Sequence, residues 1–232
     1  MKMKFKTIYI PFMKSKITLI GLILLSVFSL EAKHFRIMTL TDTNGIRNLE
    51  FMDQGKIQKI TLTKNYVTNR YTVPYSNVIH FYEEYPPLGT KVMPKPTLSI
   101  NFPKNNSNTI VLLERSEDLK TPLKYDLIED DPKKFPESTV IIYNKMDKPV
   151  LSKLGDMKIK IAPNQRKSVK LENKSDKTAP FNEKVVFATP KDGSIDFFYS
   201  TYWYVPNTQK LFCVITEDVQ SGTHELSKIS VD

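Results

Sequence analysis

The side chains that could bind a metal or carry out redox chemistry are few and widely spaced. The chain has three histidines, His34, His80 and His224, and one cysteine, Cys213. Metal sites need ligands that converge, and no H-x-H or H-x-x-x-H spacing brings two of these rings together locally. A copper site of the cysteine-histidine type is excluded by the Cys213–His224 spacing and by the lack of a later methionine. We therefore expect no metal or other cofactor, and we interpret Cys213 as a small buried core residue.

Four of the acidic residues of the chain form one cluster. Asp126, Glu129, Asp130 and Asp131 form a cluster of hard oxygen ligands that runs directly into Pro132. Calcium takes about 6–8 oxygens, usually on a loop with a turn-making glycine, and this cluster has no such glycine. We interpret it as a solvated linker, because charge runs beside proline typically mark linkers. The seven glycines form neither a G-x-S-x-G nucleophile turn nor a phosphate-binding loop. We predict no catalytic, cofactor-binding or metal-binding residues.

Residues 196–206, DFFYSTYWYVP, stand out because aromatic side chains occupy both faces of one predicted strand. Strict alternation places one set on one side (Phe197, Tyr199 and Trp203) and a second set on the other (Phe198, Tyr202 and Tyr204). A strand in a sandwich turns only one face toward its own core, so the second set needs another cover. We take Phe198, Tyr202 and Tyr204 as a candidate interaction face. We expect it to pack against the first domain, and an exposed patch for a glycan, a peptide or a partner protein is the alternative.

The elements that must position these residues are short strands. In Ser138–Leu171, the residues Met157, Ile159 and Ile161 alternate with lysines, which is the pattern of a strand with one buried face. Gly155-Asp156 suits a two-residue hairpin turn. Ile110–Leu113 is apolar throughout, which predicts a central strand covered on both faces. No segment after residue 32 has the period of an amphipathic helix.

Strand candidates recur along the whole chain after residue 32. In the first half they are His34–Leu40, Ile46–Met52, Lys56–Thr63, Arg70–Tyr75, Asn77–Glu83, Thr97–Phe102, Thr109–Glu114 and Leu123–Glu129. In the second half, four strands within Ser138–Leu171 precede Glu183–Thr189, Ser194–Val205, Lys210–Thr216 and Thr223–Val231. This spacing predicts an all-β protein of two tandem immunoglobulin-like β-sandwich domains, residues 33–131 and 132–232. The runs that follow Gly55 and Gly155 resemble each other, which favours two related domains.

The first 32 residues have the pattern of a secretory signal peptide. Five lysines precede an uncharged apolar run, Ile17–Leu30, which is shorter than the roughly 20 residues of a membrane span. Leu30-Glu31-Ala32 ends this run with a small residue at the expected cleavage position. We therefore predict export to the periplasm or the outside of the cell, with membrane contact only through this segment before cleavage. An uncleaved N-terminal anchor in the inner membrane is the alternative.

The distribution of charge along the chain is not that of a nucleic-acid-binding protein. The net charge is +9, and the predicted signal peptide contributes five lysines and one glutamate, so the remainder carries +5. These lysines are scattered rather than grouped in one run. Scattered charge keeps a protein soluble but does not form the basic stripe of a nucleic-acid-binding domain. With a single cysteine there is no disulfide framework, so stability must come from buried apolar area.

Five segments of the second half, FPEST, YNKMDKPV, KLGDMKIKIAP, DFFYSTYW and QKLFCVI, together resemble a family of exported bacterial proteins. The signature residues are Phe135-Pro136, Asn144, Pro149-Val150, Gly155, Pro163 and Tyr199-Ser200-Thr201-Tyr202-Trp203. The resemblance runs from Phe135 to Ile215 and is loose over residues 33–131. Lys210 departs from the pattern, which has arginine before the leucine. The resemblance implies two immunoglobulin-like sandwiches and no known activity.

These observations predict an exported, non-enzymatic β-sandwich protein that acts as an interaction or structural module in the cell envelope or outside it. Its expected partner is a protein or a glycan of the envelope, and no nucleic acid. The alternative is a hydrolase of envelope polymers, glycan or peptide, with a site between the two domains. A cleft lined by two carboxylates would favour the enzyme. An aromatic face without converging ionisable groups would favour the binding module.

Overall fold

Every regular element that the structure describes is a β-strand. The computed structural model describes residues 33–40, 43, 45–74, 76–104, 108–118, 120–173, 176, 179–218 and 221–231. The predicted signal peptide, residues 1–32, lies outside these ranges. Within them, the chain has no helix of the length and apolarity that crossing a membrane requires. The prediction of an all-β fold is confirmed.

The strands follow the predicted order, with one short addition at Tyr66–Val67. They are β1 (His34–Thr39), β2 (Asn48–Asp53), β3 (Lys56–Thr61), β4 (Tyr66–Val67), β5 (Tyr71–Thr72), β6 (Val78–Phe81), β7 (Leu98–Asn101), β8 (Asn108–Arg115), β9 (Leu123–Glu129), β10 (Thr139–Asn144), β11 (Val150–Leu154), β12 (Met157–Ile161), β13 (Gln165–Lys170), β14 (Phe181–Lys191), β15 (Ser194–Val205), β16 (Lys210–Glu217) and β17 (His224–Val231).

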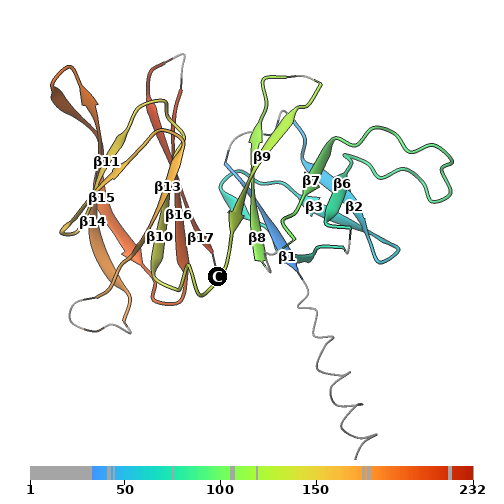
Figure 1. Cartoon of the computed structure of the whole chain (residues 1–232), viewed down its shortest axis with the longest axis horizontal. Coiled ribbons are helices and arrows are strands. Elements are labelled where there is room, and N and C mark those ends of the chain that lie inside the picture. Colours follow the sequence, from blue (N-terminus) through green and yellow to red (C-terminus); the bar gives the residue numbers. More distant parts are fainter. Residues whose placement is uncertain are drawn as a thin grey trace, which may run out of the picture. The chain divides into compact units, whose positions relative to one another are not determined.

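The N-terminal half, residues 33–131, is a sandwich of two layers (Figure 1). One layer has the order β4-β1-β8-β9, with β5 also on β1, and β1 runs parallel to β8. The other consists of the pairs β2-β3 and β6-β7. Backbone hydrogen bonds of 2.7 and 2.9 Å between Glu50 and Tyr82 join these two pairs. The second layer therefore has the order β3-β2-β6-β7.

The C-terminal half, residues 132–232, repeats this topology. Its first sheet is β13-β10-β16-β17, in which β10 runs parallel to β16, and its second sheet is β12-β11-β14-β15. The hairpins that turn at Gly55 and Gly155 connect β2 to β3 and β11 to β12, so they occupy equivalent positions in the two halves. Gly155 has a φ of 57°, which glycine adopts readily, and it provides the predicted two-residue turn.

Three hydrophobic clusters stabilise residues 33–232 as one compact unit. One cluster fills each sandwich, and the third joins the halves. In the third cluster, Ile110 and Leu112 of β8 belong together with Phe212 and Val214 of β16. Their neighbours in sequence, such as Val111, point into the sandwich cores instead. The predicted burial of Ile110–Leu113 on both faces is therefore confirmed, and the contact between the halves provides the second cover.

Candidate binding face

The side chains of the aromatic strand β15 do not alternate strictly between the outer and the inner face of the sheet. Its pairing with β14 shifts by one residue, because Phe187 is opposite Tyr199 while Ala188 is opposite Phe197. A bulge of this kind inserts an unpaired residue and reverses the alternation beyond it. Phe198 is that residue, and it packs into the C-terminal core. The prediction that Phe198 faces outward and Phe197 inward is therefore wrong, and the two exchange places.

The inward side chains of β15 build the core. Trp203 is 1% exposed and donates a hydrogen bond from its indole nitrogen to the hydroxyl of Tyr199 at 2.9 Å. Phe198 stacks on the ring of His224 with a centroid distance of 4.4 Å and on Phe187 at 6.2 Å. The Tyr-Ser-x-x-Trp signature therefore has a packing role on its inner side.

The outward side chains of β15 lie uncovered. Tyr202 is 67% exposed, Tyr204 57%, Phe197 67% and Ile195 53%. The expectation that this second set packs against the N-terminal half is wrong, because a different sheet makes that contact. The third hydrophobic cluster takes its C-terminal residues from β10, β16 and β17, and none from β15. Large aromatic side chains left in solvent on one sheet face are typical of binding surfaces.

The strand register shows which residues share this outer face. Directly opposite pairs are Ala188–Phe197, Lys184–Tyr202, Leu151–Ala188, Leu151–Lys160 and Lys153–Lys158. Four lysines therefore share the face with the aromatic side chains, and all four are exposed: Lys153, Lys158, Lys160 and Lys184. Sequence reasoning missed them as a group, because they come from three strands and appear scattered along the chain.

An open cavity of about 500 Å³ lies on the same face. Its apolar lining includes Leu151, Val186, Ala188, Ile195 and Phe197. Three of the four lysines also line it: Lys153, Lys158 and Lys160. The volume lies within the range of about 300–1,000 Å³ that is usual for small-ligand sites. We call the outward side of β12-β11-β14-β15 the Lys–Tyr face, with Lys153, Lys158, Lys160, Lys184, Ile195, Phe197, Tyr202 and Tyr204 as its defining residues.

The histidines and the cysteine that could act as metal ligands lie in different environments. His80 is exposed and shares a hydrogen bond of 2.8 Å with Ser99, while His224 stacks on Phe198. Cys213 is fully buried in the C-terminal core, and burial raises the pKa of its thiol far above the usual range. Across the described ranges, no group of three or more histidine, cysteine or acidic residues is arranged to hold a metal.

The acidic cluster is not the solvated linker that its composition indicates. Asp130 is 5% exposed and forms an ion pair with Lys210, which is 7% exposed. Asp126 accepts hydrogen bonds from Lys145 at 2.9 Å and from the hydroxyl of Tyr143 at 3.1 Å. These contacts cross from the N-terminal to the C-terminal half. Asp130 is buried and Asp126 is half-buried because the two halves pack on each other.

Charge coupling shifts the pKa of groups in this contact. Burial opposes the ionisation of Asp126, but the hydrogen bond and charge of Lys145 outweigh it and lower the pKa of the carboxyl. Burial likewise opposes the charge on Lys145, and the hydrogen bonds from its ammonium to Glu114 and Asp126 outweigh it and raise the pKa. Both groups stay charged at neutral pH, so they act as a structural ion pair rather than as a proton donor and acceptor.

A polar cavity of about 430 Å³ lies between the two halves. Its lining includes Arg36, Asn69 and Arg70 from the N-terminal half and Gln209 and Lys228 from the C-terminal half. The remaining lining residues are Asn65, Tyr66, Val67, Thr68, Ile229, Ser230 and Val231. The set carries no carboxylate, no histidine and no cysteine, so it offers no acid–base pair for hydrolysis.

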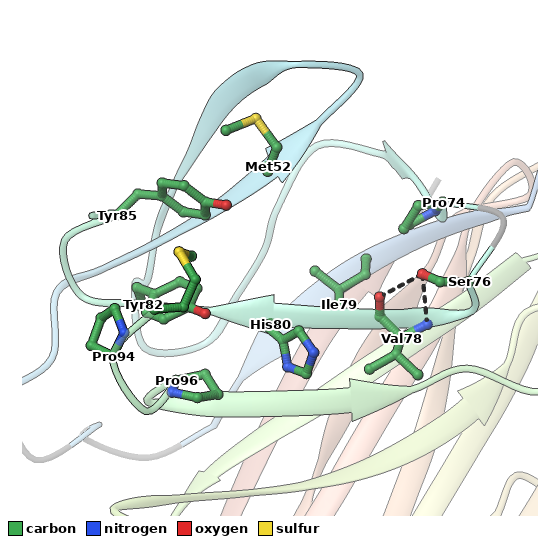
Figure 2. A pocket seen from close by; sticks show the side chains of 11 residues that line it. Met52, Pro74, Ser76, Val78, Ile79, His80, Tyr82, Tyr85, Pro94 and Pro96 are labelled. Carbon is green, nitrogen blue, oxygen red and sulfur yellow. Dashed lines mark hydrogen bonds between the residues drawn. The ribbon is translucent and has the colours of Figure 1, made fainter. Parts of the chain in front are cut away.

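A further open cavity of about 560 Å³ lies in the N-terminal half (Figure 2). Figure 2 shows Tyr82, Tyr85 and Pro94 grouped at one end and Pro74 at the other, with His80 between them. The hydroxyl of Ser76 is used in hydrogen bonds to the backbone of Val78. The lining holds no lysine, arginine or acid. This cavity can accept an apolar group, but no charged side chain in it selects a partner.

Comparison of the chain with protein-family models and with curated proteins finds no match.

Proposed function

We propose that this chain is an exported, non-enzymatic β-sandwich protein that acts as an interaction module in the cell envelope or outside it. The observation that carries the proposal is the exposure of Tyr202, Tyr204 and Phe197 together on one sheet face. Exposing the large apolar surface of each of these side chains to water is energetically unfavourable. Tyrosine also combines apolar area with a polar hydroxyl, which suits a hydrated interface. Export rests on the signal-peptide pattern of residues 1–32.

The alternative function, a hydrolase with a site between the domains, has less support. Hydrolysis of a glycan needs two carboxyl groups about 5–10 Å apart, and hydrolysis of a peptide needs a nucleophile with a base or a metal. The lining of the cavity between the halves has no carboxylate or histidine. The carboxyls of Glu114, Asp126 and Asp130 pair with lysines across the contact between the halves.

The test of the binding module uses the variant Y202S/Y204S. Both side chains are exposed, so the variant is expected to keep its melting temperature within about 2 °C, because surface substitutions cost little. Its capture by the native envelope fraction is expected to fall at least about tenfold, since tyrosines at the centre of an interface carry much of the binding energy. Y66S, at an exposed tyrosine of the N-terminal half, is the matched control. Capture of Y202S/Y204S equal to that of Y66S and the parent refutes the proposal.

Export is tested separately, by N-terminal sequencing of protein from the native envelope. The expected first residue is at or near Lys33, because cleavage follows the small residue that ends the apolar run. A chain that still begins at Met1 refutes cleavage and favours the uncleaved anchor.

A further inference from the structure

We propose that the Lys–Tyr face binds an acidic polysaccharide, with its lysines holding the carboxylate or sulfate groups and its aromatic side chains stacking on the sugar rings. This inference rests on the proposed function and names the ligand class of the same face.

The charge of the face is one-sided. The outward positions of the four strands are Leu151, Lys153, Lys158, Lys160, Asn182, Lys184, Val186, Ala188, Pro190, Ile195, Phe197, Ser200, Tyr202 and Tyr204, and no acidic residue is among them. None of the four lysines takes part in an ion pair within the described residues. By contrast, Lys124, Lys134, Lys145, Lys148 and Lys210 all pair with acids. An excess of cations on one face selects an anionic partner.

The placement of the lysines costs stability when no anion is present. Lys153 and Lys158 are directly opposite each other in the β11–β12 pair, and Lys160 lies on the same face two residues further along. The Cβ atoms of directly opposite residues are about 4.5–5.5 Å apart, and like charges on two opposite side chains are destabilising. An anionic group bound between these ammonium groups removes the repulsion. The arrangement therefore fits a ligand that carries carboxylate or sulfate groups.

The aromatic side chains favour a sugar polymer over other polyanions. Tyr202 and Tyr204 point to the same side of β15 and are about 7 Å apart along the strand, since each residue advances about 3.3 Å. Rings spaced in this way can stack on neighbouring units of one polysaccharide chain. Tyr202 is opposite Lys184, so an apolar ring contact and a cation lie side by side. Phe197 and the apolar cavity provide a further place for a ring near Lys158 and Lys160.

A lipid surface fits the face less well. Membrane-surface elements bury an apolar side about 5–10 Å into the headgroup region. Here the apolar residues lie within a four-stranded sheet and line an open cavity, rather than projecting from the surface as an apolar helix or loop.

The experiment measures binding of the purified exported chain to polygalacturonate and heparin, with neutral dextran, polyglutamate and phosphatidylglycerol vesicles as comparisons. We expect binding to one or both acidic polysaccharides and none to dextran. Raising the salt from 50 mM to 500 mM is expected to weaken that binding at least about tenfold, because salt screens exposed charges. K158E/K160E is expected to weaken binding by about 30-fold or more, and Y202S/Y204S by about tenfold or more.

K133E/K167E is the matched control, because it changes the net charge equally at two exposed lysines outside the face. It is expected to bind like the parent. Should K158E/K160E fold poorly, K158Q/K160Q replaces it and is expected to lose binding at least about tenfold. Equal losses in the control and in K158E/K160E overturn the inference, as does binding to dextran.

The outcomes also separate this inference from the proposed function. If Y202S/Y204S loses capture by the native envelope while K158E/K160E retains it, the binding module stands and the acidic polysaccharide is wrong. Preferential binding to polyglutamate or to the vesicles likewise overturns the polysaccharide and assigns the face to an acidic protein or a lipid surface. If neither variant changes capture or polysaccharide binding, both proposals are wrong.

Discussion

Replacing Lys210 with methionine tests whether the two halves depend on a buried charge pair. The ammonium of Lys210 contacts the carboxylate of Asp130, and both side chains are more than nine-tenths buried. Methionine keeps most of the apolar stem and removes the charge. The variant K210M therefore leaves the buried carboxylate of Asp130 without its partner.

The magnitude follows from removing one partner of a buried ion pair. Breaking such a pair in this way typically costs about 3–5 kcal/mol, because the remaining charge is left without compensation. We therefore expect K210M to lose about 3–5 kcal/mol of unfolding free energy at pH 7.

Urea unfolding at pH 7 measures this loss, and K210M/D130N is the second variant. An amide needs no counter-charge, so the double variant is expected to recover about half of the loss or more. For a chain of this size, about 3–5 kcal/mol corresponds to a fall in melting temperature of about 6–20 °C. A loss below about 1 kcal/mol, or a double variant as unstable as K210M, refutes the reasoning.

Three further predictions concern stability and reactivity. C213A is expected to lose about 1 kcal/mol of unfolding free energy. In the parent chain, the Cys213 thiol is expected to react with an aromatic disulfide reagent only after unfolding, because burial raises its pKa. Rapid labelling of the folded chain would contradict this. G155A is expected to lose about 1–2 kcal/mol of unfolding free energy, as measured by urea unfolding. The loss comes chiefly from the positive φ of Gly155, because the nearby Glu183 carboxylate can move away from the added methyl group. An unchanged urea midpoint would contradict this prediction. The lowered pKa of Asp126 gives stability that is complete above about pH 4 and is lost as the pH falls through the folded value. The raised pKa of Lys145 gives stability that is lost only at high pH. The loss in K145M should therefore be smaller at pH 3 than at pH 7 in urea titrations, and an equal loss would count against the ion pair.

The sequence by itself determined the strands and their turns. Alternation within Leu123–Glu129 predicted this strand with the bounds that the structure has, and the predicted strand Ser194–Val205 also has its observed bounds. Gly155-Asp156 predicted its hairpin, because a two-residue turn depends on local backbone angles. The likeness between the runs after Gly55 and Gly155 belongs to equivalent hairpins of two halves with one topology. These features are local, so neighbouring residues are enough to specify them.

The tertiary structure alone decided which faces are covered. The bulge opposite Phe187 exchanges Phe197 and Phe198, since it depends on the pairing of β15 with β14 and not on β15 itself. The contact between the halves uses β8 and β16, which buries Asp130 and leaves Tyr202 in solvent. The lysines of the Lys–Tyr face come from β11, β12 and β14, and only their registers bring them onto one face. Each of these outcomes depends on how one strand pairs or packs with another, and the alternation within a single strand carries no information about which strand or sheet will lie against it.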